Sequence, residues 1–167
     1  MRFWIHIAII LIILAVLALF NFKIRLFLFA LLASFSLLHN RITQNYIGFE
    51  LCTLLTVIAT LKYGFATGIF VALFSFGLGL IFGTEPEPGI LICLLASLLI
   101  VIVSSFFDSK DLLVAGMLST LVYDLVISTF YYSTGSNPFT ILSFSVTHLL
   151  LNFLIFKSLG SFFFSLI

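Results

Sequence analysis

The chain has 167 residues, of which 63% are hydrophobic and only 8% are charged, with a formal net charge of +1. A mean hydropathy of +1.37, together with 22 phenylalanines and 3 prolines, excludes a disordered chain and an ordinary soluble domain. Because the 7 basic residues form no cluster, we expect no nucleic-acid partner.

Apolar segments separated by polar residues follow one another along the chain, at 3–20, 26–38, 46–61, 65–83, 90–107, 112–132 and 139–166. Most of them approach the ~20 residues that a membrane-spanning helix needs. They are apolar on all sides rather than alternating, which favours helices over the strands of a transmembrane barrel. We therefore predict an all-α fold with one membrane domain, 1–167. It is expected to be a polytopic transmembrane helix bundle with a six-helix core over 26–166 and an extra N-terminal helix.

The first segment, 3–20, follows Arg2 and has the charge pattern of a signal peptide. No small-residue cleavage pattern comes after it, and Lys23 and Arg25 follow directly. We expect a retained helix that precedes the six-helix core.

The basic residues of the loops indicate an orientation. With seven spans, one side of the membrane collects Lys23, Arg25, Lys62 and Lys110, and the other collects Arg2 and Arg41. The side with more Lys and Arg is normally cytoplasmic. We therefore expect a multi-pass protein of the cell membrane, with its N-terminus outside and its C-terminus in the cytoplasm.

The third and fourth segments carry different side-chain patterns at helical spacing. In the third, a polar face is predicted by Tyr46, Glu50, Thr53, Thr56 and Thr60. In the fourth, a seam of small residues is formed by Gly64, Gly68, Ala72, Ser75, Gly79 and Gly83. Such a seam favours close helix packing. Cys52 and Cys93 fit neither a disulfide framework nor metal-ligand spacing, so we interpret them as packing residues.

The sixth and seventh segments carry two further polar stripes. The sixth has Gly116, Thr120, Asp124 and Ser128, continued by Tyr131, and the seventh has Ser145, His148 and Asn152. A rise of ~1.5 Å per residue places Glu50, Asp124 and His148 in the outer half or at the midplane of a ~30 Å hydrocarbon layer. An ionisable group at that depth is costly unless it is paired, so these three residues are candidate functional residues.

Three polar loops, 39–45, 84–89 and 133–138, are expected on the outer side above these stripes. Together, loops and stripes predict a pocket that opens to the outside. Two structural alternatives stay open: Asp124 and His148 pair to join two helices, and the Thr side chains bond to their own helices. The ligand type also stays open, because the carboxylates suit a cation or an amine-bearing ring, whereas Arg41 and His148 suit an anion.

Motifs of intramembrane proteases, metallopeptidases and P-loop proteins are missing from the sequence. The few basic residues, mostly in short loops, do not suit the transfer of lipid phosphates. We therefore expect no enzyme and no cofactor. Any energy coupling must come from another chain or from an ion gradient.

From about residue 26 to the end, the chain resembles the substrate-binding (S) components of energy-coupling-factor vitamin transporters, especially small archaeal versions. The resemblance rests on the six-helix layout, on residues 48–53 leading into 62–68, and on residues 147–153 of the last segment. It implies a small vitamin-like ligand near the outer surface, held by the three outer loops. It also implies a membrane coupling subunit and ATPase subunits as partners in the lipid bilayer.

The resemblance and the polar stripes give a set of expected substrate-binding residues: Glu50, Thr53, Asp124, Tyr123, His148, Asn152, Arg41, Asn45, Glu85 and Asn137. Residues 118–125 are also similar to the rod-shape-determining MreD family, a membrane scaffold for cell-wall synthesis. On that alternative, the buried polar residues serve packing and contacts with other membrane proteins.

Overall fold

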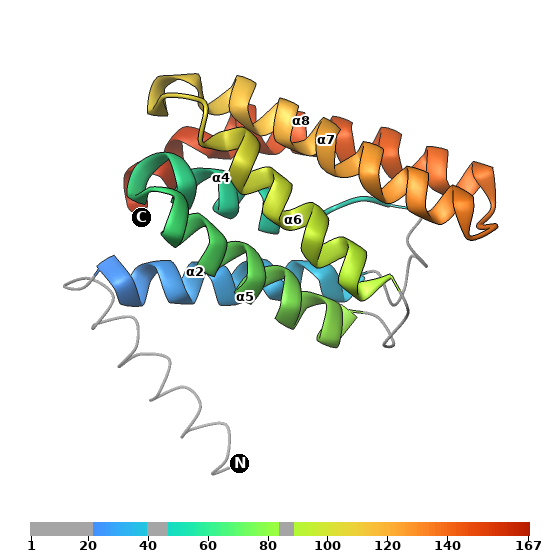
Figure 1. The fold of residues 1–167 in the computed structure, drawn as a ribbon. Helices are drawn as coiled ribbons and strands as arrows, with labels where there is room; N and C mark the ends of the chain where they lie inside the picture. Colours follow the sequence, from blue (N-terminus) through green and yellow to red (C-terminus); the bar gives the residue numbers. More distant parts are fainter. Residues whose placement is uncertain (1–21, 40–46, 84–88) are drawn as a thin grey trace, which may run out of the picture.

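The computed structural model describes residues 22–39, 47–83 and 89–167, and all regular structure in these ranges is helical (Figure 1). The α-helices are α2 (Phe22–Ser36), α4 (Cys52–Tyr63), α5 (Phe65–Gly83), α6 (Ile90–Ser104), α7 (Leu112–Ser133) and α8 (Pro138–Leu166). Two short 3-10 helices, η1 (Leu37–His39) and η2 (Ser109–Asp111), lie between them. The all-α prediction is confirmed for these residues, whereas the predicted helix over 3–20 lies outside them.

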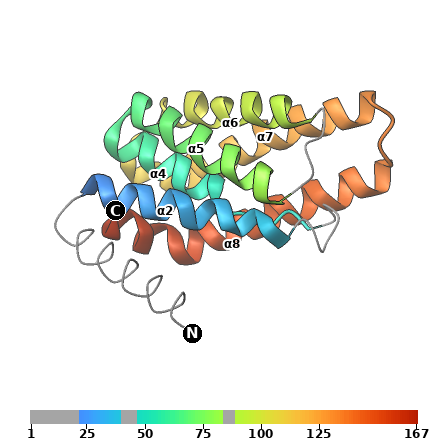
Figure 2. The same ribbon diagram turned by 90° about the horizontal axis from the view of Figure 1, so that it is seen from below.

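Helix α4 is the centre of the bundle. It contacts α2, α5, α6, α7 and α8, which surround it on all sides (Figures 1 and 2). Every residue from Cys52 to Thr60 is buried. The helix ends at Gly64, whose φ of 89° is easily adopted only by glycine and whose N–H donates to the Thr60 carbonyl. A short helix whose first nine residues are all buried is therefore in contact with each of the five longer helices.

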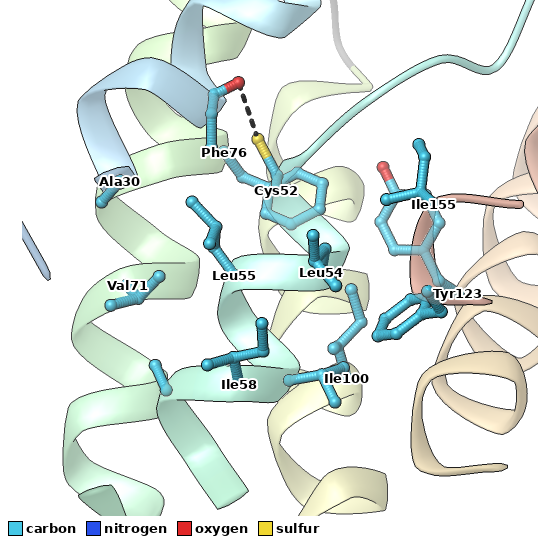
Figure 3. Packing of buried hydrophobic residues seen from close by; sticks show 14 of the residues in the cluster. Ala30, Cys52, Leu54, Leu55, Ile58, Val71, Phe76, Ile100, Tyr123 and Ile155 are labelled. Atoms are coloured by element: carbon cyan, nitrogen blue, oxygen red, sulfur yellow. Dashed lines mark hydrogen bonds between the residues drawn. The ribbon is translucent and has the colours of Figure 1, made fainter. Parts of the chain in front are cut away.

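The core around α4 is built from interlocking aliphatic side chains. Leu55 and Ile58 of α4 lie between Val71 of α5 and Ile100 of α6 (Figure 3). At the top of the same helix, the Cys52 thiol lies 3.4 Å from the Ala33 carbonyl of α2, the contact dashed in Figure 3. Cys52 and Cys93 are both buried, as expected for packing residues.

The small-residue seam of α5 allows its neighbours to approach closely. A Cβ atom added to Gly68 would overlap the side chain of Thr60 on α4, and one added to Gly79 would overlap the Leu37 side chain of η1. Ala72 and Ser75, between these two glycines, are fully buried. The packing role predicted for this seam is confirmed at these positions.

Helices α7 and α8 are long and apolar enough to cross a membrane. The spans that meet this condition are Ser109–Ser133, with 25 residues, and Pro138–Leu166, with 29 residues. Helices α4, α5 and α6 are apolar but shorter, and α2 has 15 residues. By length and composition alone, two helices of the described chain could therefore cross a membrane.

Basic residues gather at one end of the bundle, where α8 ends and α2 begins (Figure 1). Arg25 Nη1 donates to the Leu166 carbonyl at 2.9 Å, and Lys62 Nζ donates to the Phe164 carbonyl at 2.7 Å. The Tyr63 hydroxyl donates to the carbonyl of Ile167. The last carbonyls of α8, which lack partners within the helix, are thereby satisfied by cationic and hydroxyl donors.

Candidate functional site

Three ionisable side chains meet inside the bundle. His148 of α8 is fully buried, with its Nδ1 2.6 Å from Asp124 Oδ1 of α7 and its Nε2 3.2 Å from Glu50 Oε1. Glu50 and Asp124 are buried as well. The imidazole therefore bridges two carboxylates that come from distant parts of the sequence. We call Glu50, His148 and Asp124 the buried triad.

Glu50 reaches His148 from a non-helical segment, which corrects the predicted helix over 46–61. Helix α4 begins only at Cys52, because the chain before it packs directly on α8. The Gly48 N–H donates to Thr147 Oγ1 at 2.9 Å, and a Cβ atom on Gly48 would overlap the Cβ of His148. Glycine is thus required where the backbone touches α8.

The Glu50 carboxylate also closes the first turn of α4. Its Oε1 and Oε2 atoms accept a hydrogen bond from the Thr53 N–H, at 3.1 Å and 2.9 Å. This N–H belongs to the first turn, where no carbonyl within the helix is available, and a negative charge is favourable there. One side chain therefore fixes both the start of α4 and the contact with His148.

The hydrogen-bond geometry restricts the charge of the buried triad. A carboxylate oxygen only accepts, so both His148 contacts are hydrogen bonds only if the group holds a proton in addition to that of neutral imidazole. That proton sits on the ring, giving an imidazolium between two carboxylates, or on one carboxyl group. In both cases the triad keeps a net negative charge.

A cavity of about 230 Å³ lies against the buried triad. Glu50 and His148 form its polar end, whereas Asp124, on the other side of the imidazole, is not among the lining residues. Its apolar walls combine aliphatic side chains with five aromatic ones, Phe49, Phe76, Tyr123, Tyr131 and Phe144. Gly89, Ser136 and Thr140 also line it, at the end of the bundle where α6 starts and α7 turns into α8.

Aromatic rings enclose the imidazole of His148. Phe144, one turn earlier on α8, stacks on it with a centroid distance of 5.2 Å and an interplanar angle of 19°. Tyr123 lies 5.6 Å from it, and Phe76 of α5 lies 5.5 Å from Tyr123. Water-excluding walls of this kind strengthen the electrostatic interactions that they surround.

The other expected site residues have varied positions. The Thr53 side chain is buried on α4, and Asn152 is buried one turn after His148, where its Nδ2 donates to the His148 carbonyl at 3.1 Å. Asn137 caps α8, because its Oδ1 accepts from the Phe139 N–H at 2.9 Å. Of the expected site residues, Tyr123 lines the cavity together with Glu50 and His148. Arg41, Asn45 and Glu85 lie outside the described residues.

Sequence reasoning missed three of the aromatic side chains that line the cavity: Phe49, Phe76 and Phe144. Phe144 precedes His148 by four residues and shares its helix face, so the spacing contained a usable signal. Phe76 had no such signal, because it is one of 22 phenylalanines and reaches the site only through tertiary packing.

In the described part of the chain, no group of three His, Cys, Asp or Glu side chains has an arrangement that could hold a metal ion. Both ring nitrogens of His148 face carboxylate oxygens, so neither is directed at a ligand of its own. The arrangement suits binding through the Glu50 carboxylate and the aromatic walls.

No family model, curated protein or solved structure compared with the chain matches it.

Proposed function

We propose that this protein is embedded in a membrane and captures a small molecule from the outer face, as the substrate-binding subunit of a transporter. The observation that carries the proposal is the cavity against the buried triad. A mostly apolar cavity with a few convergent polar groups is the usual form of a small-molecule site. A buried ionisable cluster beside it is the usual mark of function in a membrane domain.

The outward-facing side chains support a lipid environment. Large apolar side chains are 63% to 81% exposed on the outer surfaces of α6, α7, α8 and the α6–α7 connection: Leu91, Phe106, Leu125, Phe139 and Leu142. Only 39% of the apolar window of α7 and 22% of that of α8 is buried. The core helix of a soluble protein would be mostly buried, and monomeric soluble proteins rarely expose large apolar patches. We infer that lipid covers these faces and that all the helices belong to one multi-pass bundle.

The two ends of the bundle differ in a way that supports outward capture. Arg25, Lys62 and Lys110 lie toward the end that holds the C-terminus, whereas Gly89 and Ser136 line the cavity at the opposite end (Figure 1). Basic residues mark the cytoplasmic side. On this basis the C-terminus is cytoplasmic and the cavity lies near the outer surface.

The transport role extends the resemblance to energy-coupling-factor S components. The cavity is small, at about 230 Å³, and helices contribute most of its lining residues, so it suits capture of one compact molecule rather than a continuous channel. No ATP-binding motif occurs in the sequence. A membrane coupling subunit and ATPase subunits would therefore supply the work, as the resemblance implies.

A scaffold of the MreD kind is the alternative, and one observation favours it. Asp124 and His148 join α7 to α8 at 2.6 Å, a contact that would fix the bundle without any ligand. On this alternative, the exposed apolar faces of α7 and α8 contact other membrane proteins.

Native mass spectrometry of the purified full-length protein, followed by ligand-binding assays, tests the proposal. We expect a small molecule to co-purify and to raise the melting temperature, with binding lost in Glu50→Ala and weakened in Asp124→Asn. Asn at position 124 keeps an acceptor for His148 and so guards against misfolding. A protein without a co-purifying or stabilising small molecule, and with transport in cells intact in both variants, would contradict the proposal. Co-purifying membrane proteins and neighbouring cell-shape genes would then support the scaffold.

A further inference from the structure

We infer that the cavity selects a small organic cation, whose N–H groups donate to the Glu50 carboxylate and whose apolar part lies against the aromatic walls. This inference rests on the proposed function and names the substrate class of the same cavity. Three features carry it: the negative charge of the buried triad, a lone pair left on the Glu50 carboxylate, and the aromatic side chains that line the cavity.

The negative charge at the polar end of the cavity comes from the composition of the buried triad. Two carboxylates surround one imidazole, so a net negative charge remains wherever the shared proton sits. Lys and Arg are missing from the cavity lining formed by the described residues. A negative charge in a low-dielectric cavity is stabilised by an oppositely charged ligand and destabilised by an anion.

His148 is not available to an anion. Its Nδ1 faces Asp124 and its Nε2 faces Glu50, so an anionic ligand would have to break one of these contacts and leave a buried carboxylate unpaired. Removing one partner of a buried ion pair is strongly destabilising, because it leaves an uncompensated charge in the interior. Of the two ligand types compatible with the sequence, the cation is the one that leaves the triad intact.

Glu50 keeps an acceptor position for the ligand. Its Oε2 accepts the Thr53 N–H at 2.9 Å, whereas Oε1 accepts that N–H at 3.1 Å and also faces His148. The Thr53 hydroxyl and the Cys52 thiol interact with the same carboxylate. Each carboxylate oxygen has two lone pairs, so Oε2 can accept one more hydrogen bond. A charged N–H donor would form the stronger, charge-assisted type of bond there.

The aromatic walls suit the same ligand. Phe49, Phe76, Tyr123, Tyr131 and Phe144 surround the cavity, and an organic cation gains favourable cation–π interactions when it lies over such rings. The cavity, at about 230 Å³, is smaller than the ~300–1,000 Å³ that is usual for drug-sized ligands. We therefore expect a compact amine or amidine with one ring or a short apolar chain.

A charge-matched probe set tests the inference on the full-length protein in detergent. The probes are two cations, phenethylammonium and benzamidinium, the neutral phenethyl alcohol and the anion phenylacetate. We expect saturable thermal stabilisation by at least one cation and none by the alcohol or the anion at equal concentration. Glu50→Gln should weaken cation binding about tenfold or more, since Gln keeps the shape and loses the charge.

Asp108→Asn is the matched control, because it removes the same charge from a side chain that is 78% exposed. It should leave the affinity unchanged. Equal or tighter binding of the alcohol or of phenylacetate would overturn the cation inference and leave the pocket standing. So would a neutral or anionic native ligand, or equal losses in Glu50→Gln and Asp108→Asn. If no probe binds and nothing co-purifies, both the inference and the proposed function fail.

Discussion

Gly48 is the residue on which the geometry of the site depends most directly. Its backbone lies against His148, and its N–H is bonded to Thr147 on the same helix. Any side chain at this position must push the segment 47–51 away from α8. Glu50, two residues later, would then lose its contact with the imidazole.

We predict that Gly48→Ala lowers the free energy of unfolding by about 1–3 kcal/mol, the usual cost of overpacking, and abolishes ligand binding. Gly77→Ala is the matched control on α5. There a Cβ meets only Leu94 Cδ2, at 3.9 Å, and Ala is favoured over Gly in a helix by about 1 kcal/mol. Chemical denaturation of both variants measures the difference. A Gly48→Ala protein as stable and as competent in binding as Gly77→Ala would contradict the close contact with His148.

At the scale of single residues, the sequence identified the three ionisable residues of the buried triad but not all of the contacts between them. Glu50, Asp124 and His148 stood out because ionisable groups are rare among so many apolar residues. The pairing of Asp124 with His148 was foreseen as one alternative and is present. The contact between Glu50 and His148 spans 98 residues, and no local pattern specifies such a pair.

At the scale of helices, the apolar runs predicted α5, α7 and α8 to within a residue or two. Their limits coincide with glycine, proline and polar loops, which are strong local signals. The start of α4 was wrong by six residues, at Cys52 instead of 46. Residues 46–51 are as compatible with a helix as those that follow. The packing of Gly48 on α8 prevents the helix from starting earlier, and this packing is a tertiary interaction that the local sequence does not specify.

The N-terminus of α8 gives a prediction at the same scale. Pro138 occupies the first turn and Asn137 accepts the Phe139 N–H, so the helix has a favourable residue at both positions. Asn137→Ala should reduce the free energy of unfolding by about 1 kcal/mol. Asn137→Asp should restore it, because the carboxylate caps the helix and complements its dipole. Thermal denaturation in detergent distinguishes the variants. Identical curves for Ala and Asp would show that the cap is not formed.

For the whole molecule, the difference between the basic end and the cavity end of the bundle bears on how the protein would lie in a membrane. Helix α7 runs from the basic end to the cavity end, and its 22 residues extend about 33 Å at ~1.5 Å per residue. That length matches a hydrocarbon layer of ~30 Å. A transporter subunit that captures its ligand outside must therefore present the residues that flank α7 to opposite sides of the membrane.

Cysteine labelling across the membrane tests this arrangement. Thr134 is exposed at the cavity end of α7, and Ser109 is exposed at its basic end. The two native cysteines are buried, so we expect little maleimide labelling of the wild-type protein. We predict that a membrane-impermeant maleimide labels Thr134→Cys in intact cells. Ser109→Cys should react only after permeabilisation, because the proposed orientation places Lys110 and the neighbouring basic end in the cytoplasm. Labelling of both from the same side would exclude a spanning α7. The reverse pattern would place the cavity near the cytoplasm, where it could not capture a ligand from outside.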